Sequence, residues 1–249
     1  MVRTCAVAIA LALWCAAVIR AADVTDRVTQ TVPLAPGRAI QVDTTVGDVT
    51  IVGSNRPDIA VEIVRRAPSS DSFSKFPVVI DNTGDALRVG ATQTTGGRDP
   101  ALISTVVIRA PANANFRSIR LFEGRLRISG LTAACDADVR RGSIEATALA
   151  GRVRLETGLG SVDVKDAALA PGGMLRVRVF NGPLRVRFAR TPQNARILAV
   201  TLNGQIKSDI PLTMKDQFGP RFGETTLGSG EPVMSLDVVK GDIAISVAR

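Results

Sequence analysis

A glycine followed by apolar residues two and four positions later recurs along this chain, and this repeat limits its fold more than any other feature. Two-residue alternation places one side of a strand in a core and the other side in water. The glycine supplies a bend that other residues adopt only with strain. Strands joined by such bends favour an elongated all-β structure over a compact enzyme. The eight copies begin at Gly47, Gly124, Gly142, Gly151, Gly160, Gly182, Gly204 and Gly241; six are clean, and the copies at Gly142 and Gly204 end in Ala146 and Ser208.

The spacing of these glycines predicts stacked rungs of about 18–24 residues. Aligned on the glycines, Ile144, Val162, Leu184 and Ile206 form one inward column. We therefore predict a single-stranded β-solenoid, with looser rungs over 27–111, regular rungs over 116–249 and no helix. A β-sandwich is the alternative, because strands at intervals near nine residues also suit that fold.

Two Asn-Gly pairs are hairpin signals in isolation, but their surroundings favour a different role. A tight turn at Asn181-Gly182 would need an N–H from Pro183, which has none. A hairpin at Asn203-Gly204 would place Leu202 opposite Gln205 and so mix the core and solvent sides of the strands. Both pairs are predicted to be left-handed corners between strands that continue in one winding direction.

The N-terminus resembles an export signal. Arg3 precedes an apolar run from Cys5 to Ile19, and small residues follow at Ala21 and Ala22. We predict a signal peptide over 1–22 and one β-solenoid domain over 23–249. The alternatives are an uncleaved anchor and a lipoprotein modified at Cys15.

The composition excludes several kinds of catalytic and metal site. The chain contains no histidine and no tyrosine, so the commonest general base and the commonest zinc ligand are missing. Removal of the leader leaves Cys135 as the single cysteine, which predicts a buried, inert thiol. Asp136 and Asp138 share a strand face, but they are isolated between arginines and predict surface charge in place of a calcium site. We predict no catalytic residue, no metal and no cofactor.

The arginines are the unusual chemical feature of the sequence. Between Arg117 and Arg196 there are 15 basic and 7 acidic residues, a surplus equal to the formal net charge of +8. Solvated strand charge that discourages aggregation explains them without a binding role. The functional interpretation is a docking face for an anionic polymer or membrane surface. Aligning Gly151 with Leu175 predicts Arg152 beside Arg176 and Arg154 beside Arg178, and these four arginines are the candidate anionic-ligand site.

Several segments resemble the bacterial putative-adhesin domains of unknown function. They are TLNGQIKSDIPL (201–212), FGPRFGETTLGSGEP (218–232), VVKGDIAIS (238–246) and, more weakly, GDVTIVG (47–53). The resemblance implies an exported, right-handed β-solenoid, and it supplies no catalytic residues.

Together these observations predict a non-catalytic cell-envelope scaffold or binding module, periplasmic or on the cell surface. The expected partners are anionic glycans, lipids or envelope proteins, with no specific nucleic acid and no membrane span after cleavage. Two alternatives stay open: a carbohydrate-active enzyme of the β-helix type, and a regulatory envelope component.

Overall fold

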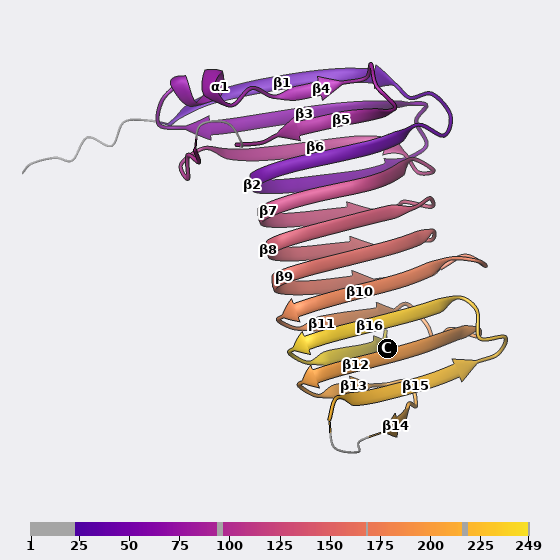
Figure 1. The fold of residues 1–249 in the computed structure, drawn as a ribbon. Coiled ribbons are helices and arrows are strands. Elements are labelled where there is room, and N and C mark those ends of the chain that lie inside the picture. Colours follow the sequence, from indigo (N-terminus) through magenta and orange to yellow (C-terminus); the bar gives the residue numbers. More distant parts are fainter. Residues whose placement is uncertain (1–22, 94–96, 168, 216–218, 249) are drawn as a thin grey trace, which may run out of the picture.

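The computed structural model describes residues 23–93, 97–167, 169–215 and 219–248. All strands described there join one mixed sheet of 17 strands, and the helix among them has five residues (Figure 1). The all-β class predicted from the sequence is therefore confirmed. Because the described strands connect into one sheet, the two separate sheets of the alternative sandwich are not formed by them.

Four long strands form the centre of the stack, and each bends once at a glycine. β2 pairs with β7, β7 with β8 and β8 with β9, always in parallel. We call the part of each strand before the bend its first arm and the part after it its second arm. The four strands are β2 (Ala39–Ser54), β7 (Asn115–Ser129), β8 (Cys135–Thr147) and β9 (Arg152–Lys165).

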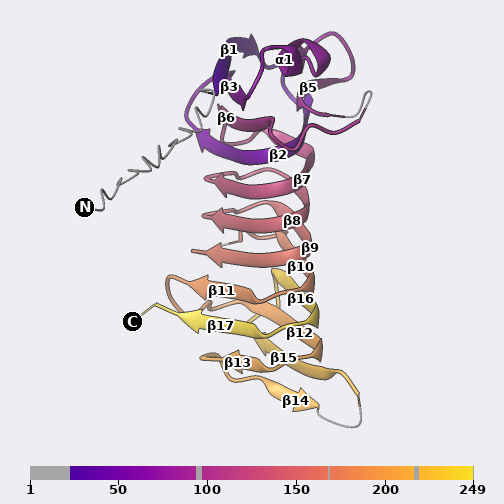
Figure 2. The same cartoon turned by 90° about the vertical axis from the view of Figure 1, so that its left-hand side faces the viewer.

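Below β9 the two arms are separate strands. β10 and β11 both lie parallel beside β9, β16 and β17 lie beside them, and β12 and β13 follow. The C-terminal strand pair therefore lies between two pairs that precede it in the chain (Figure 2). The bounds are β10 (Met174–Asn181), β11 (Leu184–Phe188), β12 (Ala195–Asn203), β13 (Ile206–Ser208), β16 (Val233–Lys240) and β17 (Ile243–Val247).

Antiparallel strands cover parts of both ends of the parallel stack. Above β2, strand β5 runs parallel beside its first arm and β6 beside its second arm. β4 pairs antiparallel with β5, β3 with β6, and β1 with β3. Below, β15 pairs with β12, and β14 pairs with β15. These elements are β1 (Val24–Pro33), β3 (Asp58–Ala67), α1 (Asp71–Lys75), β4 (Val79–Asp81), β5 (Ala86–Ala91), β6 (Ile103–Pro111), β14 (Thr213–Lys215) and β15 (Arg221–Leu227).

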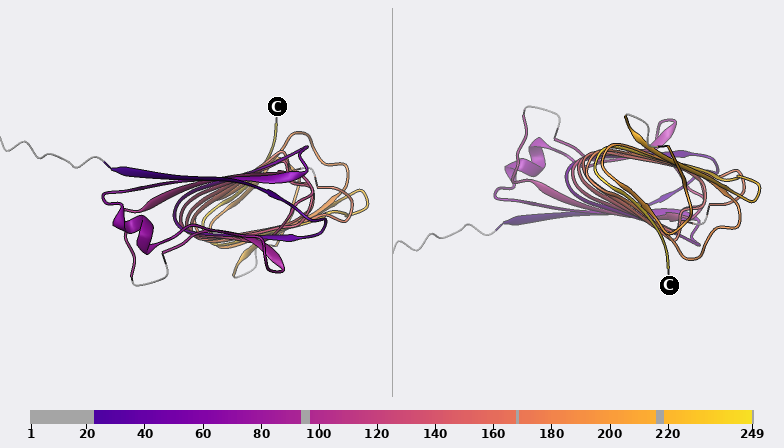
Figure 3. Two further views of the ribbon diagram at one scale, coloured as in Figure 1. Left: turned by 90° about the horizontal axis from the view of Figure 1, so that it is seen from above. Right: turned by 90° about the horizontal axis from the view of Figure 1, so that it is seen from below.

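The core lies between the first and second arms. Seen along the stack, successive strands superimpose around an oval outline (Figure 3). The buried apolar side chains form one core cluster. Ile144 is in register with Val162, and Val162 with Leu184, as the sequence predicts. All three side chains are fully buried.

Two stacked glycines show why the bends need this residue. Gly142 and Gly182 have φ values of +135° and +143°, which L-residues rarely adopt. A Cβ atom at Gly142 would overlap the carbonyl oxygen of Gly124, and one at Gly182 would overlap that of Gly160. Close approach of successive bends therefore adds a steric requirement to the conformational one.

Both Asn-Gly pairs lie between strands that continue in one direction, as predicted. Gly182 joins β10 to β11, which both run parallel to β9, and Gly204 joins β12 to β13, which run parallel to β16 and β17. Gly204 does not have a positive φ, so the left-handed corner expected there is wrong.

Three further details differ from the sequence prediction. Ile206 is not beside Leu184, because Ile243 of β17 lies between them and is in register with both. The segment 67–75 contains the helix α1, although no helix was predicted, and β4 was not predicted either. The predicted leader over 1–22 lies outside the described residues. Within the described residues, no helix has the length and apolar character needed to cross a bilayer.

Candidate functional site

The outer face of the first arms carries the arginines that the sequence singled out. In β9 and β10, valine and leucine point into the core, so the alternating arginines point outward. Arg154 is in register with Arg176, whereas Arg152 is beside Met174 and Arg178 is beside Glu156. The structure therefore brings together one of the arginine pairs of this face, Arg154 and Arg176.

The predicted register of this face is wrong by two residues. The prediction placed Arg154 beside Arg178, which are separated by 24 positions, whereas the corner glycines Gly160 and Gly182 are separated by 22. Because β9 and β10 are aligned by those corners, Arg154 is beside Arg176, at the same spacing of 22. A shift of two leaves every side chain on its own face but changes its neighbours.

Carboxylates lie beside part of this arginine set. Arg154 Nη2 is 3.3 Å from Glu156 Oε2, and Arg154 Nη1 is 4.0 Å from Asp136 Oδ2. Arg178 is in register with Glu156 on one side and Asp237 on the other. The cluster of four like charges expected from the sequence is thus interrupted by acids.

Arg176 has a different environment from Arg178. Its register neighbours are Arg154 and Ser235, and its side chain is exposed. Among the described residues, no carboxylate oxygen lies within 4.0 Å of its guanidinium group. Arg154 and Arg176 are therefore a like-charge pair that is compensated on one side only.

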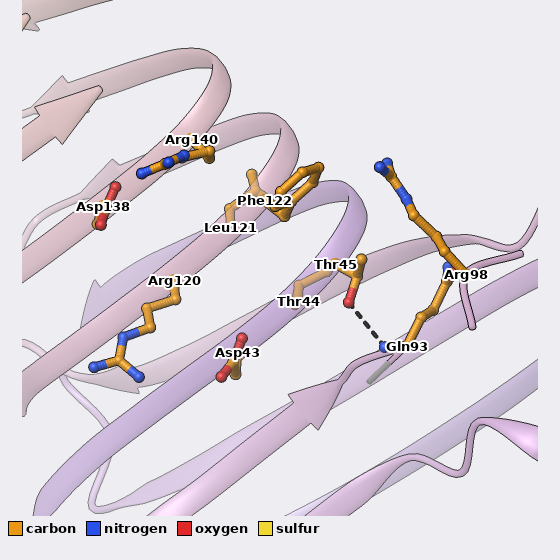
Figure 4. A pocket seen from close by; sticks show the side chains of 10 residues that line it. All are labelled: Asp43, Thr44, Thr45, Gln93, Arg98, Arg120, Leu121, Phe122, Asp138 and Arg140. Atoms are coloured by element: carbon orange, nitrogen blue, oxygen red, sulfur yellow. Dashed lines mark hydrogen bonds between the residues drawn. The ribbon is translucent and has the colours of Figure 1, made fainter. Parts of the chain in front are cut away.

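A hollow of about 410 Å³ opens on the same face nearer the upper end (Figure 4). Arg98 covers one wall, with its guanidinium carbon 4.6 Å from the centre of the Phe122 ring and its Nη2 3.0 Å from Glu123 Oε2. Gln93 N donates a hydrogen bond of 2.8 Å to Thr45 Oγ1. The lining residues are Asp43, Thr44, Thr45, Gln93, Arg98, Arg120, Leu121, Phe122, Asp138 and Arg140.

Two carboxyl groups in this hollow are shifted toward their neutral form. Burial raises the pKa of Asp43, while the charge of Arg120 opposes the shift. Burial also raises the pKa of Asp138, the charge of Glu156 adds to the shift, and Arg140 and Arg120 oppose it. Arg120 of β7 is in register with Asp43 of β2 on one side and with Asp138 of β8 on the other, so the arginine lies between the two carboxyl groups.

A second hollow of about 360 Å³ adjoins the first and shares Arg120 and Asp138 with it. Arg154 and Glu156 line its lower end, so the two hollows connect the upper region of the face with the arginine pair. Sequence reasoning missed both hollows, because β2, β7, β8 and the segment around Arg98 are far apart in the chain. The basic stretch that begins at Arg117 was one available signal. Alignment of the glycine copies at Gly47 and Gly124, which places Asp43 beside Arg120, was the other.

The described residues contain no cluster of potential metal ligands, and their one cysteine is not reactive. No group of three or more potential ligands among Asp, Glu, Cys and His gathers within them. Cys135 is buried, as predicted, and burial raises the pKa of its thiol to about 12. A thiol of this kind stays protonated at neutral pH and does not act as a nucleophile.

No family model and no curated protein matches this chain. It is similar to the structure of a putative cell adhesion protein from Clostridium sporogenes, with 11% identity, a TM-score of 0.48, and coverage of 90% of this chain and 100% of that one. It is also similar to a putative adhesin from Parabacteroides distasonis, with 11% identity, a TM-score of 0.31, and coverage of 90% and 97%. A putative lipid binding protein from that organism is 8% identical, with a TM-score of 0.28 and coverage of 90% and 97%. At these identities and TM-scores, the similarities do not establish a function for this chain.

Proposed function

We propose that this protein is a non-catalytic, exported binding module of the cell envelope, with an adhesin-like role and a right-handed β-solenoid fold. Parallel stacking of the two arms over β2, β7, β8 and β9 supports the fold. The basic outer face of the first arms supports binding of phosphate or carboxylate groups on envelope glycans. The proposed ligand residues are Arg152, Arg154, Arg176 and Arg178.

The observation that carries this proposal is the pairing of Arg154 with Arg176. Like charges on neighbouring strands repel each other, and such a pair is unfavourable without a counter-ion. A phosphate or carboxylate group held by both guanidinium groups removes the repulsion and accepts directional hydrogen bonds. Arg152 and Arg178 flank the pair on the outward sides of β9 and β10 and extend the attraction along the face.

A matched pair of double variants tests the proposal. R154Q/R176Q removes two positive charges from the first-arm face, and R185Q/R187Q removes two from the second-arm face, where Arg185 is in register with Asp163. We expect R154Q/R176Q to elute from heparin at clearly lower salt than R185Q/R187Q, because several contacts with sulfate or carboxylate groups are lost together. Equal elution of the two variants would show that net charge alone governs retention, and would contradict a site on the first-arm face.

Export is proposed to accompany removal of the segment over 1–22. The apolar run after Arg3 and the small residues Ala21 and Ala22 support it. Intact-mass measurement of protein from its native envelope is expected to give an N-terminus near Ala22 or Asp23. Retention of Met1, or a lipid on Cys15, would contradict removal of the whole segment over 1–22.

A further inference from the structure

Large apolar side chains are exposed where the strands bend from the first arm to the second. Leu159 of β9, Phe180 of β10, Val239 of β16 and Leu202 of β12 are 49%, 46%, 39% and 51% exposed. Each lies one or two positions before a corner glycine, at Gly160, Gly182, Gly241 or Gly204. We call these four residues the corner patch. The bends that carry them lie below one another in Figure 1, on the side that Figure 2 shows.

The register places the members of the corner patch close together. Asn181 is in register with Leu159 and with Lys240, and Lys240 is in register with Asn203. Phe180, Val239 and Leu202 immediately precede Asn181, Lys240 and Asn203, so they lie side by side on three neighbouring strands. Strand positions that point to water normally carry polar side chains, and a contiguous apolar group there indicates a contact surface.

Two cationic side chains beside the corner patch have no carboxylate partner within the described residues, whereas the nearby acid already has a hydrogen-bond partner. Arg141 is in register with Leu159, and Lys240 follows Val239 directly. In the described part of the chain, no carboxylate lies within 4.0 Å of either cation. The nearby acid Asp242 is already used, because its Oδ1 accepts a hydrogen bond of 2.9 Å from Gln205 N.

We propose that the corner patch docks on the surface of an anionic lipid bilayer. Phenylalanine, leucine and valine enter the boundary between headgroups and acyl chains, where apolar burial is favourable. Lys240 and Arg141 stand beside them without a carboxylate partner within 4.0 Å among the described residues, although the Arg141 guanidinium carbon lies 5.9 Å from the centre of the Phe122 ring. Both side chains are long enough to reach lipid phosphates. An acidic protein partner would satisfy the cations equally, but a bilayer also takes up four separate apolar tips without a complementary pocket for each.

This proposal does not depend on the arginine pair of the first-arm face. Arg154 and Arg176 contribute nothing to the corner patch, and the corner patch contributes nothing to heparin retention. R154Q/R176Q is expected to keep its lipid contact, while F180S/L202S is expected to keep its elution from heparin. Failure of one proposal is therefore distinguishable from failure of the other.

A single tryptophan provides a local probe of the contact. The chain has one tryptophan, Trp14, and no tyrosine, so the variant W14F has no strong intrinsic fluorophore. In that background F180W places an indole in the corner patch, and I103W places one at a residue of β6 that is 49% exposed and outside it. The N-terminal apolar segment is common to both variants, so lipid binding by that segment affects them equally.

The two variants are mixed with vesicles of phosphatidylcholine and phosphatidylglycerol whose acyl chains carry bromine. We expect the F180W emission to move to shorter wavelength and to be quenched, while I103W stays unquenched. Adding R141Q and K240Q to F180W is expected to weaken vesicle binding about fivefold for each charge removed. Vesicles of phosphatidylcholine alone should bind more weakly, and added salt should weaken binding to the mixed vesicles.

Three results would overturn the proposal. F180W would remain unquenched, or I103W would be quenched to the same extent, if the corner patch did not enter the lipid. An F180W emission that shifts with protein concentration in the absence of vesicles would assign the patch to a second copy of the chain. Equal thermal midpoints of W14F and W14F/F180W establish that the probe leaves the fold intact.

Discussion

Leu184 of β11 is in register with Ile243 of β17, although most of the last quarter of the chain separates them. Ile206 lies on the other side of Ile243, so one apolar residue from the C-terminal strand pair fills the space between two earlier rungs. The lower part of the core is therefore complete only when β16 and β17 are in place.

Replacing Ile243 is expected to destabilise the lower rungs strongly. Ile243 is fully buried, and Ile243→Ala removes apolar contacts with the side chains of both neighbouring strands, which costs about 2–5 kcal/mol. Ala244→Asp is the control, because that position points outward between Arg185 and Lys207. Urea unfolding should show a loss for the first variant and little change, or a gain, for the second. Similar losses in both would contradict the inserted register.

The sequence predicted this column as far as Leu184 for a physical reason. Alternation and corner glycines are local signals, and they determine which side of each strand is buried and where the strand bends. Strand order is not local, because any strand with the same alternation fits against the same neighbour. The copies at Gly204 and Gly241 share the glycine and the isoleucine two positions later. Nothing within either copy shows that the strand after Gly241 lies between the strands after Gly182 and Gly204.

The candidate site was predicted in part for the same reason. Alternation correctly places Arg154 and Arg176 on the outside of their strands. Their neighbours depend on a register that a two-residue shift changes without exposing any apolar residue. Arg98 joins the face through the chain reversal between β5 and β6, and this reversal has no repeat that sequence reasoning could follow.

Gly142→Ala is expected to disrupt the stack. The backbone φ of +135° gives a side chain a strain of about 1–3 kcal/mol, and the new Cβ also overlaps the carbonyl oxygen of Gly124. Gly84→Ala is the control, since no heavy atom lies within 4 Å of a Cβ there and its φ is not positive. Thermal unfolding should show a large fall for the first variant alone. A parent-like midpoint for Gly142→Ala would mean that the bend accepts a side chain.

Thr157→Val is expected to stabilise the protein by about 1 kcal/mol. The Thr157 hydroxyl is buried in the core and has no hydrogen-bond partner among the described residues. Its register neighbours Val139 and Val179 show that valine fits this column. Thr201→Val should have the opposite effect, because Thr201 Oγ1 donates a hydrogen bond of 2.8 Å to the Gly241 carbonyl. Chemical denaturation of both variants measures the two changes in unfolding free energy. A lower stability of Thr157→Val would mean that the Thr157 hydroxyl has a hydrogen-bond partner.

Asp138→Asn is expected to stabilise the fold near neutral pH, with a gain that disappears in acid. Burial and the charge of Glu156 on β9 raise the pKa of Asp138, and Asp136 on its own strand adds to the shift, against Arg140 and Arg120. A raised pKa means that folding favours the protonated carboxyl. The associated stability is present below the unfolded-state pKa and is lost as the pH rises through the folded-state value. The neutral amide introduced by the substitution does not titrate, so the variant retains at neutral pH the stability that the parent carboxyl loses there.

Asp81→Asn supplies the opposite sign for comparison. The Thr83 hydroxyl and the Thr83 N–H both donate to the Asp81 carboxylate and lower its pKa. Its contribution is present above the unfolded-state pKa and is lost as the pH falls through the folded-state value. Denaturation midpoints measured across the acidic and neutral range should therefore separate the variants. The midpoint of Asp138→Asn should exceed that of the parent at neutral pH and converge with it in acid. The midpoint of Asp81→Asn should fall below that of the parent at neutral pH and also converge with it in acid. A neutral-pH loss in Asp138→Asn would mean that Arg120 and Arg140 outweigh the burial of this carboxyl and that the hollow favours its charged form.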